Sequence, residues 1–243
     1  MDNALKILLL FGERSEVRLT DISDYLGVAS STAHRMLAML LYRGFVRQDS
    51  RSKVYLPGTA LTGVAYSILQ RFDFRKELHP FLERLNLELQ ETVHLGLLDG
   101  TMVRFIDAIE SPKGVRVASR LGVSMPAPST STGKAMLAQM SQAEVHALFP
   151  DEELEALTEK SLRGRSELDR QLALVRKHGY AVSSEESEQG VSSVAVAFAP
   201  SRAPARLAFN VSVPTSRMSR QDQARIAKAL QVAVHDAGSV LHG

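Results

Sequence analysis

The sequence contains no cysteine and no tryptophan, and aromatic residues make up only 6% of its 243 residues. The absence of cysteine excludes disulfide scaffolds, thiolate zinc sites, iron–sulfur clusters and cysteine nucleophiles. The longest apolar runs, such as residues 7–11, are far shorter than the roughly 18 residues that a membrane span needs. The N-terminus lacks a basic segment ahead of an apolar stretch, so no secretory signal is expected. We therefore expect a cytoplasmic protein that does not bind a membrane.

Neither sign of charge dominates the chain, because 29 Lys and Arg residues stand against 27 Asp and Glu residues, for a net charge of +2. A net charge this close to zero neither supports nor excludes nucleic acid as a partner, so the distribution of charge along the chain has to decide. The apolar fraction of 44% is close to the average of globular proteins, and the length allows one or two domains.

Three short helical patterns open the chain. Thr20 is a suitable N-cap for the second helix, which is about two turns long and ends at Gly27. Ser30 is a suitable cap for the third helix, whose apolar residues recur at helical spacing until about Gly44. Two helices joined by a three-residue turn that contains a glycine fit the helix-turn-helix arrangement, in which the second helix enters the DNA major groove.

The outward face of this third helix tests the interpretation. Four apolar residues are expected to face inward: Ala33, Met36, Leu37 and Leu40. Four polar residues near the helix start are left facing outward: Ser31, Thr32, His34 and Arg35. All four side chains can hydrogen-bond to bases or phosphates, and arginine is the side chain best suited to guanine. We therefore predict that these four residues contact DNA.

A hairpin pattern and a concentration of positive charge follow the third helix. Residues 45–48 and 53–56 are the expected strands, and a polar turn joins them. Residues 35–53 carry a net charge of +4, although the whole chain sums to only +2. We expect three further basic residues of a winged helix-turn-helix to contact DNA: Arg43, Arg51 and Lys53. A small three-helix fold with a solvated basic face is the alternative.

The rest of the chain mixes helical patterns with strand patterns. A hairpin is expected at Asp99-Gly100, and capping-box patterns mark helix starts at Ser141, Ser166 and Ser219. This mixture predicts an α+β domain with an antiparallel sheet that helices partly cover. The expected division is a DNA-binding domain over residues 1–58, a connecting and dimerising helix within 59–74, and a second domain over 75–243.

Several segments resemble the IclR family of bacterial transcriptional regulators, and the resemblance covers nearly the whole chain. It rests on Leu19-Thr20-Asp21-Ile22, residues 30–37, Gly44-Phe45-Val46, residues 55–58, residues 133–138 and Gly179-Tyr180. The resemblance implies that the second domain is a GAF-like effector-binding domain that senses a small organic acid. It also implies that the protein binds double-stranded DNA as a homodimer or a dimer of dimers. We expect the paired recognition helices to read a pseudo-palindromic operator.

A run of hydroxyl residues precedes a helix-forming segment in the second domain. Thr130, Ser131, Thr132 and Gly133 stand where hydroxyls and free backbone N–H groups at a helix start suit a carboxylate or phosphate. An ordinary capped helix explains the same pattern. The family resemblance implies that residues of later strands line the same cavity: Ser183, Val191, Ser193, Asn210 and Ser212. This lining is uncharged, and Met125 is expected to add an adaptable apolar wall.

No pattern indicates a metal, a cofactor or catalysis. The seven histidines never fall at helical pair spacing, and no nucleophile-elbow motif occurs. The acidic run of Glu185, Glu186 and Glu188 is expected to be a solvated loop. We therefore expect a ligand-responsive DNA-binding regulator that is not an enzyme. Two alternatives remain: an enzyme that acts on a small acid through its second domain, and a constitutive DNA-binding protein without a ligand.

Overall fold

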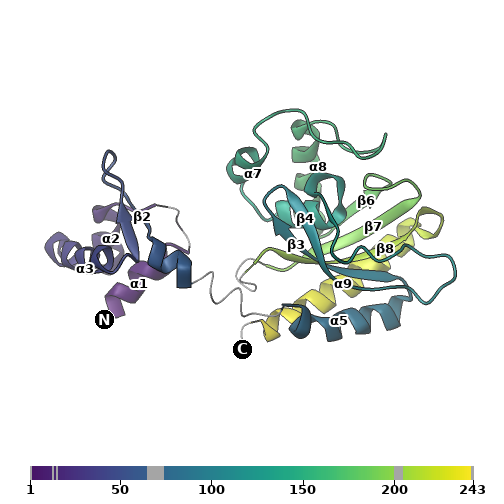
Figure 1. Ribbon diagram of the computed structural model, residues 1–243, viewed down its shortest axis with the longest axis horizontal. Helices are drawn as coiled ribbons and strands as arrows, with labels where there is room; N and C mark the ends of the chain where they lie inside the picture. Colours follow the sequence, from purple (N-terminus) through teal and green to yellow (C-terminus); the bar gives the residue numbers. More distant parts are fainter. Residues whose placement is uncertain (1, 13, 15, 65–73, 200–204, 242–243) are drawn as a thin grey trace. The chain divides into compact units, whose positions relative to one another are not determined.

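The computed structural model describes the chain except residues 1, 13, 15, 65–73, 200–204 and 242–243. The chain forms two compact units, which are divided between Phe72 and Asp73 and are described separately below (Figure 1). Residues 59–64 are helical. The remainder of the predicted connecting helix, and with it most of the expected dimerising surface, lies outside the described residues.

Ahead of the helical residues 59–64, the described part of the N-terminal unit contains three helices and a two-stranded hairpin. Its elements are α1 (Asp2–Leu10), α2 (Leu19–Leu26), α3 (Ser30–Tyr42), β1 (Val46–Gln48) and β2 (Tyr55–Pro57). A short extended segment before α2 was not predicted: the backbone N–H and C=O groups of Val17 and Tyr55 pair across it at 3.0 and 2.8 Å. Ile7, Ile22 and Leu37 meet in one buried core with residues of the hairpin. The predicted helix-turn-helix with a wing is confirmed for this unit.

Both N-caps predicted in this unit are wrong, because each helix begins one residue or more before the expected start. Arg18 is the N-cap of α2, and the carboxylate of Asp21 accepts its backbone N–H at 2.8 Å. Ala29 is the N-cap of α3, so Ser30 is already helical. The predicted end of α2 is correct, since Gly27 has a φ of 63°, in the left-handed region that favours glycine.

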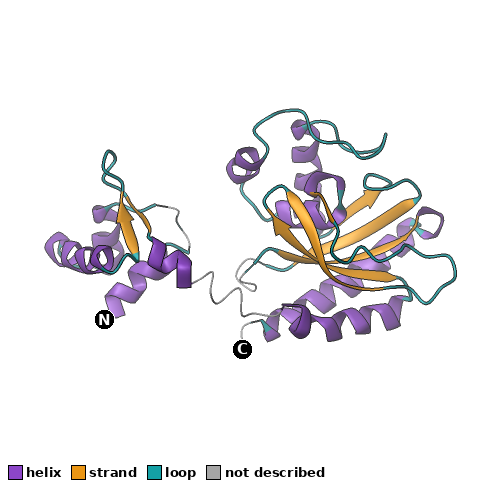
Figure 2. Cartoon of the chain, viewed as in Figure 1, coloured by secondary structure: helices purple, strands orange, loops and turns teal. Residues whose placement is uncertain are grey.

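The C-terminal unit is built on an antiparallel sheet, as predicted, and this sheet has six strands (Figure 2). The sheet order is β5-β4-β3-β8-β7-β6. The strands are β3 (Thr92–Asp99), β4 (Met102–Ile109), β5 (Ser124–Pro126), β6 (Ala181–Ser184), β7 (Val191–Ala197) and β8 (Leu207–Pro214). The helices are α5 (Phe74–Leu89), α6 (Ser131–Leu137), α7 (Gln142–Leu148), α8 (Arg165–His178) and α9 (Arg220–Val240), with short 3₁₀ turns at Ala127–Ser129 and Thr215–Arg217.

Helices cover both faces of this sheet. Helices α5 and α9 lie side by side against one face, and α6 packs on the other face with α8 outside it (Figure 1). Every residue of the central strand β8 is therefore buried except its last, Pro214. Among the described residues, none of the helices combines the length and the apolar character that a membrane span needs.

Two of the three predicted capping boxes are confirmed. Ser141 and Ser219 each accept a backbone N–H from the third residue of the helix that follows, and its carboxylate accepts the backbone N–H of the serine. The box predicted at Ser166 is wrong. Helix α8 starts earlier, with Gly164 as its N-cap, and the backbone N–H of Ser166 donates to Glu152 Oε1 at 3.0 Å. A carboxylate from a preceding loop thus replaces the local cap.

Candidate functional site

The outward face of α3 is polar at its N-terminal end. The structure leaves Ser31, Thr32, His34 and Arg35 exposed. Ala33 and Leu37 on the same helix are fully buried. This division follows the helical period, because positions 33, 37 and 40 fall on one stripe and the polar positions between them point away from the core.

The hairpin and the end of α3 present the other basic residues. Arg43, Arg51 and Lys53 are all exposed. The carboxylate of Asp49 shapes the hairpin turn, because Oδ1 accepts the backbone N–H groups of Arg51 at 3.1 Å and Ser52 at 2.7 Å. These hydrogen bonds, those from Ser52 foremost, hold the pKa of Asp49 below its ordinary value. The turn thus keeps its only acidic side chain engaged and projects its basic side chains into solvent.

The predicted hydroxyl run lies at the start of α6, where every residue from Ser129 to Leu137 is buried. Thr130 is the N-cap of this helix, and its Oγ1 accepts the backbone N–H of Gly133 at 2.9 Å. A side chain at Gly133 has no room, because a Cβ atom there would lie 2.2 Å from the carbonyl oxygen of Ala127. Because the Gly133 N–H donates to Thr130 Oγ1, it is not free to bind an anion as expected. Thr132 Oγ1 is buried and has no hydrogen-bond partner.

Four of the predicted ligand-binding residues meet in one buried hydrogen-bond chain. Asn210 Nδ2 donates to Ser131 Oγ at 2.9 Å, and the Ser131 and Ser193 hydroxyls are 2.7 Å apart. Ser212 Oγ donates to Asn210 Oδ1 at 2.8 Å. Ser183 lies outside this chain, since its hydroxyl donates to the backbone carbonyl of Ser129 at 3.5 Å.

Sequence reasoning missed the next member of this chain, His94 on β3. Its Nδ1 lies 3.1 Å from Asn210 Oδ1, and its Nε2 accepts the backbone N–H of Arg120 at 3.2 Å. Because Nε2 is an acceptor, the ring proton belongs on Nδ1, which donates to Asn210. Burial lowers the pKa of His94 from 6.5 to about 4, so the ring is neutral near pH 7. The only signal in the sequence was a histidine in the middle of an apolar strand.

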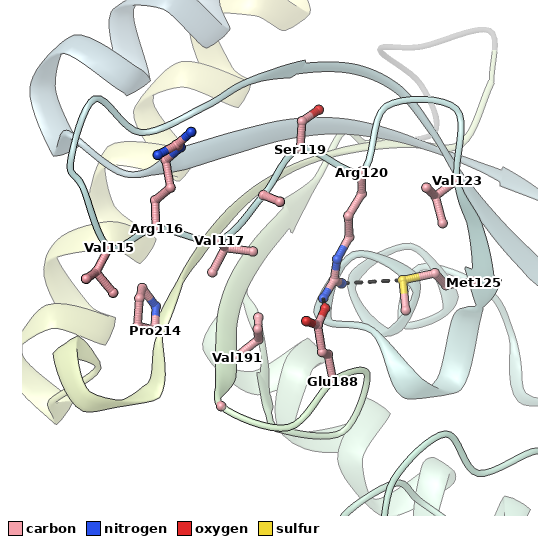
Figure 3. Close-up of a pocket in the computed structure, with 12 residues that line it drawn as sticks. Val115, Arg116, Val117, Ser119, Arg120, Val123, Met125, Glu188, Val191 and Pro214 are labelled. Carbon is pink, nitrogen blue, oxygen red and sulfur yellow. Dashed lines mark hydrogen bonds and ion pairs between the residues drawn. The ribbon is translucent and has the colours of Figure 1, made fainter.

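A cavity of about 540 Å³ (Figure 3) adjoins this hydrogen-bond chain through Arg120, which lines the cavity and donates its backbone N–H to His94. It is lined by residues 115–120, Val123, Met125, Glu188, Gly190, Val191 and Pro214. Of the nine residues predicted to bind a ligand, only Val191 lines this cavity, together with Met125, the predicted apolar wall. The lining was expected to be uncharged, but it includes Arg116, Arg120 and Glu188.

Glu186 contradicts the expectation that the acidic run forms a solvated loop, because it is mostly buried. Glu185 and Glu188 lie in a loop as expected, but each of them also forms an ion pair. Glu186 pairs with Lys134 of α6, whose side chain is fully buried, and both carboxylate oxygens lie 2.7 Å from Nζ. Glu185 pairs with Lys160, and Glu188 Oε2 accepts a hydrogen bond from Arg120 at 2.9 Å. The carboxylates of this loop, residues 185–190, therefore pair with basic side chains from three distant segments. No local sequence pattern predicted these pairs.

The neutral state of His94 predicts a pH-dependent stability. Between pH 6.5 and about 4 the unfolded chain binds a proton at this ring and the folded chain does not, so stability falls as the pH falls through this range. We expect the free energy of unfolding by urea to drop by about 2 kcal/mol between pH 7 and pH 5 on account of His94. The His94→Gln variant should lose this part of the pH dependence, whereas His178→Gln, at an exposed position, should keep it. Equal pH dependence in the wild type and His94→Gln would contradict the assignment.

Both units match proteins of a known family. Residues 1–50 match the IclR helix-turn-helix domain, and residues 66–238 match the bacterial transcriptional regulator IclR C-terminal domain. The chain is similar to the HTH-type transcriptional regulator XynR of Escherichia coli, with 33% identity over 96% of this chain and 93% of the relative. It is also similar to the acetate operon repressor of Salmonella typhimurium, with 30% identity over 90% of this chain and 81% of the relative.

The fold has a counterpart among solved structures. The crystal structure of Thermotoga maritima IclR aligns with a TM-score of 0.66 and 26% identity, over 100% of this chain and 98% of that chain. The helix-turn-helix with its exposed polar face and the helix-covered antiparallel sheet are thus parts of one shared architecture. The chain belongs to the IclR family of bacterial transcriptional regulators, and it is a DNA-binding regulator of transcription.

Proposed function

We propose that this protein controls a catabolic operon in response to a small organic acid. It acts in the cytoplasm, and it binds a pseudo-palindromic operator as a homodimer or a dimer of dimers. DNA contacts come from Ser31, Thr32, His34, Arg35, Arg43, Arg51 and Lys53, all of which are exposed. The acid binds in the C-terminal unit, at the cavity and the polar residues beside it that were singled out from the sequence.

One observation carries this proposal: the C-terminal unit has a cavity with a largely buried arginine in its lining, and the other unit of the chain is a helix-turn-helix. The cavity of about 540 Å³ is large enough for a small organic molecule, and the guanidinium of Arg120, which points into it, favours an anion. One relative, of Salmonella typhimurium, is by its name a repressor of an acetate operon, and acetate is a carboxylate.

The experiment measures binding of the full chain to the DNA upstream of its own gene, by fluorescence anisotropy, with and without small carboxylates. We expect specific binding whose logarithmic affinity falls linearly with the logarithm of salt concentration, because basic residues displace counterions from phosphates. At least one carboxylate should change the DNA affinity and be recovered chemically unchanged. Conversion of the acid would favour an enzyme, and tight DNA binding that ignores every carboxylate would favour a constitutive DNA-binding protein.

A further inference from the structure

Arg120 occupies a distinctive position among the charged residues of the cavity. It lies in the loop between β4 and β5, and only 11% of its side chain is exposed. Its guanidinium points across the cavity between Met125 and Glu188 (Figure 3). A guanidinium held largely out of water needs a negative partner, because desolvation of an unpaired charge is costly.

The partner that the structure supplies is weakly held. Glu188 contacts Arg120 Nη2 at 2.9 Å, but 62% of its own side chain is exposed. The other contacts of the guanidinium are to neutral groups: Nη1 lies 3.3 Å from Ser187 Oγ and 3.4 Å from Met125 Sδ. Ion pairs with an exposed partner contribute little, since water competes for both charges. A carboxylate that enters the cavity can therefore displace Glu188 from the guanidinium at a small cost in free energy.

The backbone of Arg120 is fixed by the polar chain described above. Its N–H donates to His94 Nε2, and His94 is bound in turn to Asn210 in the sheet. The loop that carries Glu188 is anchored separately, because Glu185 and Glu186 are paired with Lys160 and Lys134. An exchange of partners at Arg120 thus requires only that the Glu188 side chain swing into solvent, with both backbones in place.

We propose that Arg120 is the residue that binds the carboxylate of the effector. In the absence of the effector, Glu188 pairs with the Arg120 guanidinium, and the effector displaces Glu188 when it binds. This inference rests on the proposed ligand-sensing function and names its recognition group. The ligand class is an organic acid with a modest apolar body, because Val117, Val123, Met125 and Val191 line the cavity around the guanidinium. Glu188 acts as an internal competitor that sets the concentration at which the acid binds.

The test follows the side-chain Nε–Hε signal of Arg120 by ¹⁵N nuclear magnetic resonance of the labelled full chain, with the signal assigned from the Arg120→Gln variant. Sodium acetate replaces sodium chloride at constant ionic strength, and acetamide serves as the neutral probe of the same shape. We expect acetate, and not acetamide, to shift the signal. Glu188→Gln should raise the acetate affinity by up to about fivefold, as removal of a weak competing ion pair predicts.

Arg116→Gln is the matched control, since Arg116 lines the same cavity but pairs with Glu110. It should leave acetate binding at Arg120 unchanged. A signal that acetate does not move, or an acetate affinity that is equal in Glu188→Gln and the wild type, would overturn the proposal. DNA binding on the same samples separates the two proposals. A carboxylate response that persists in Arg120→Gln refutes the role of Arg120 alone, whereas acetate binding without any DNA binding refutes the proposed function.

Discussion

Replacement of Lys134 by methionine is expected to lower the free energy of unfolding by about 3–5 kcal/mol. The Lys134 side chain is fully buried on α6, and its Nζ lies 2.7 Å from both carboxylate oxygens of Glu186. Burial lowers the pKa of Lys134 and raises that of Glu186, so each charge depends on the other for stabilisation. Methionine preserves most of the volume but leaves the carboxylate of Glu186, which is itself mostly buried, without its partner. Urea unfolding at pH 7 measures the change.

The double variant Lys134→Met, Glu186→Leu distinguishes charge from packing. We expect it to recover most of the lost stability, because an apolar pair of similar volume often replaces a buried ion pair without cost. Lys160→Met is the matched control. Lys160 pairs with Glu185, which is on the same loop as Glu186, but the Lys160 side chain is mostly exposed, so we expect a change below about 1 kcal/mol. A double variant no more stable than Lys134→Met would show that the site responds to shape and not to the buried charge.

The Arg35→Ala variant is expected to weaken binding to the operator by roughly 1–3 kcal/mol and to relax the base preference at one position in each half-site. The reason is that Arg35 is exposed on the N-terminal part of α3, where a recognition helix meets base edges. Nothing in the core should change, because Arg35 is exposed and the buried residues of α3 are Ala33, Leu37 and Leu40. Anisotropy titrations against the operator and a set of single-base variants measure both effects.

Lys53→Ala provides the contrast on the hairpin. Lys53 is exposed in a turn and is proposed to contact phosphate, so its loss should weaken binding to all sequences alike and make the salt dependence less steep by about one unit. If the two variants bind operator and mismatched DNA as the wild type does, α3 and the hairpin do not form the DNA interface that we propose.

Local patterns predicted most of the helices and strands correctly, and they failed where a residue from elsewhere took over a local role. The helix pattern of α3 identified its buried stripe, and the Ser141 and Ser219 boxes marked true helix starts. Ser166 failed as a cap because Glu152, from a preceding loop, accepts its backbone N–H. Propensity rules see only the residues next to a helix end, so they cannot anticipate a cap that arrives from another segment.

The candidate site in the C-terminal unit was predicted only in part, again because some of its contacts come from segments distant in the sequence. The hydroxyl run at residues 130–133 was found from composition, and the resemblance added Ser193 and Asn210, which the structure joins to Ser131. Arg120 and His94 were not found. An arginine in a polar loop and a histidine in a strand have the same local signature whether they serve a cavity or not.

The amino-acid sequence alone predicted most of the helical segments, most of the strands and the buried side of α3. It could do so because hydrogen bonding within a helix and the periodicity of apolar residues depend only on near neighbours in the sequence. Which polar and charged side chains meet was decided by the order of the strands. Adjacent β3 and β8 place His94 opposite Asn210, 116 positions along the chain. The loop between β6 and β7 likewise reaches Lys134 and Arg120, 52 and 68 positions from their partners. Such pairs are stabilised only after the sheet has assembled and excluded water, so they leave no trace in any short stretch of sequence.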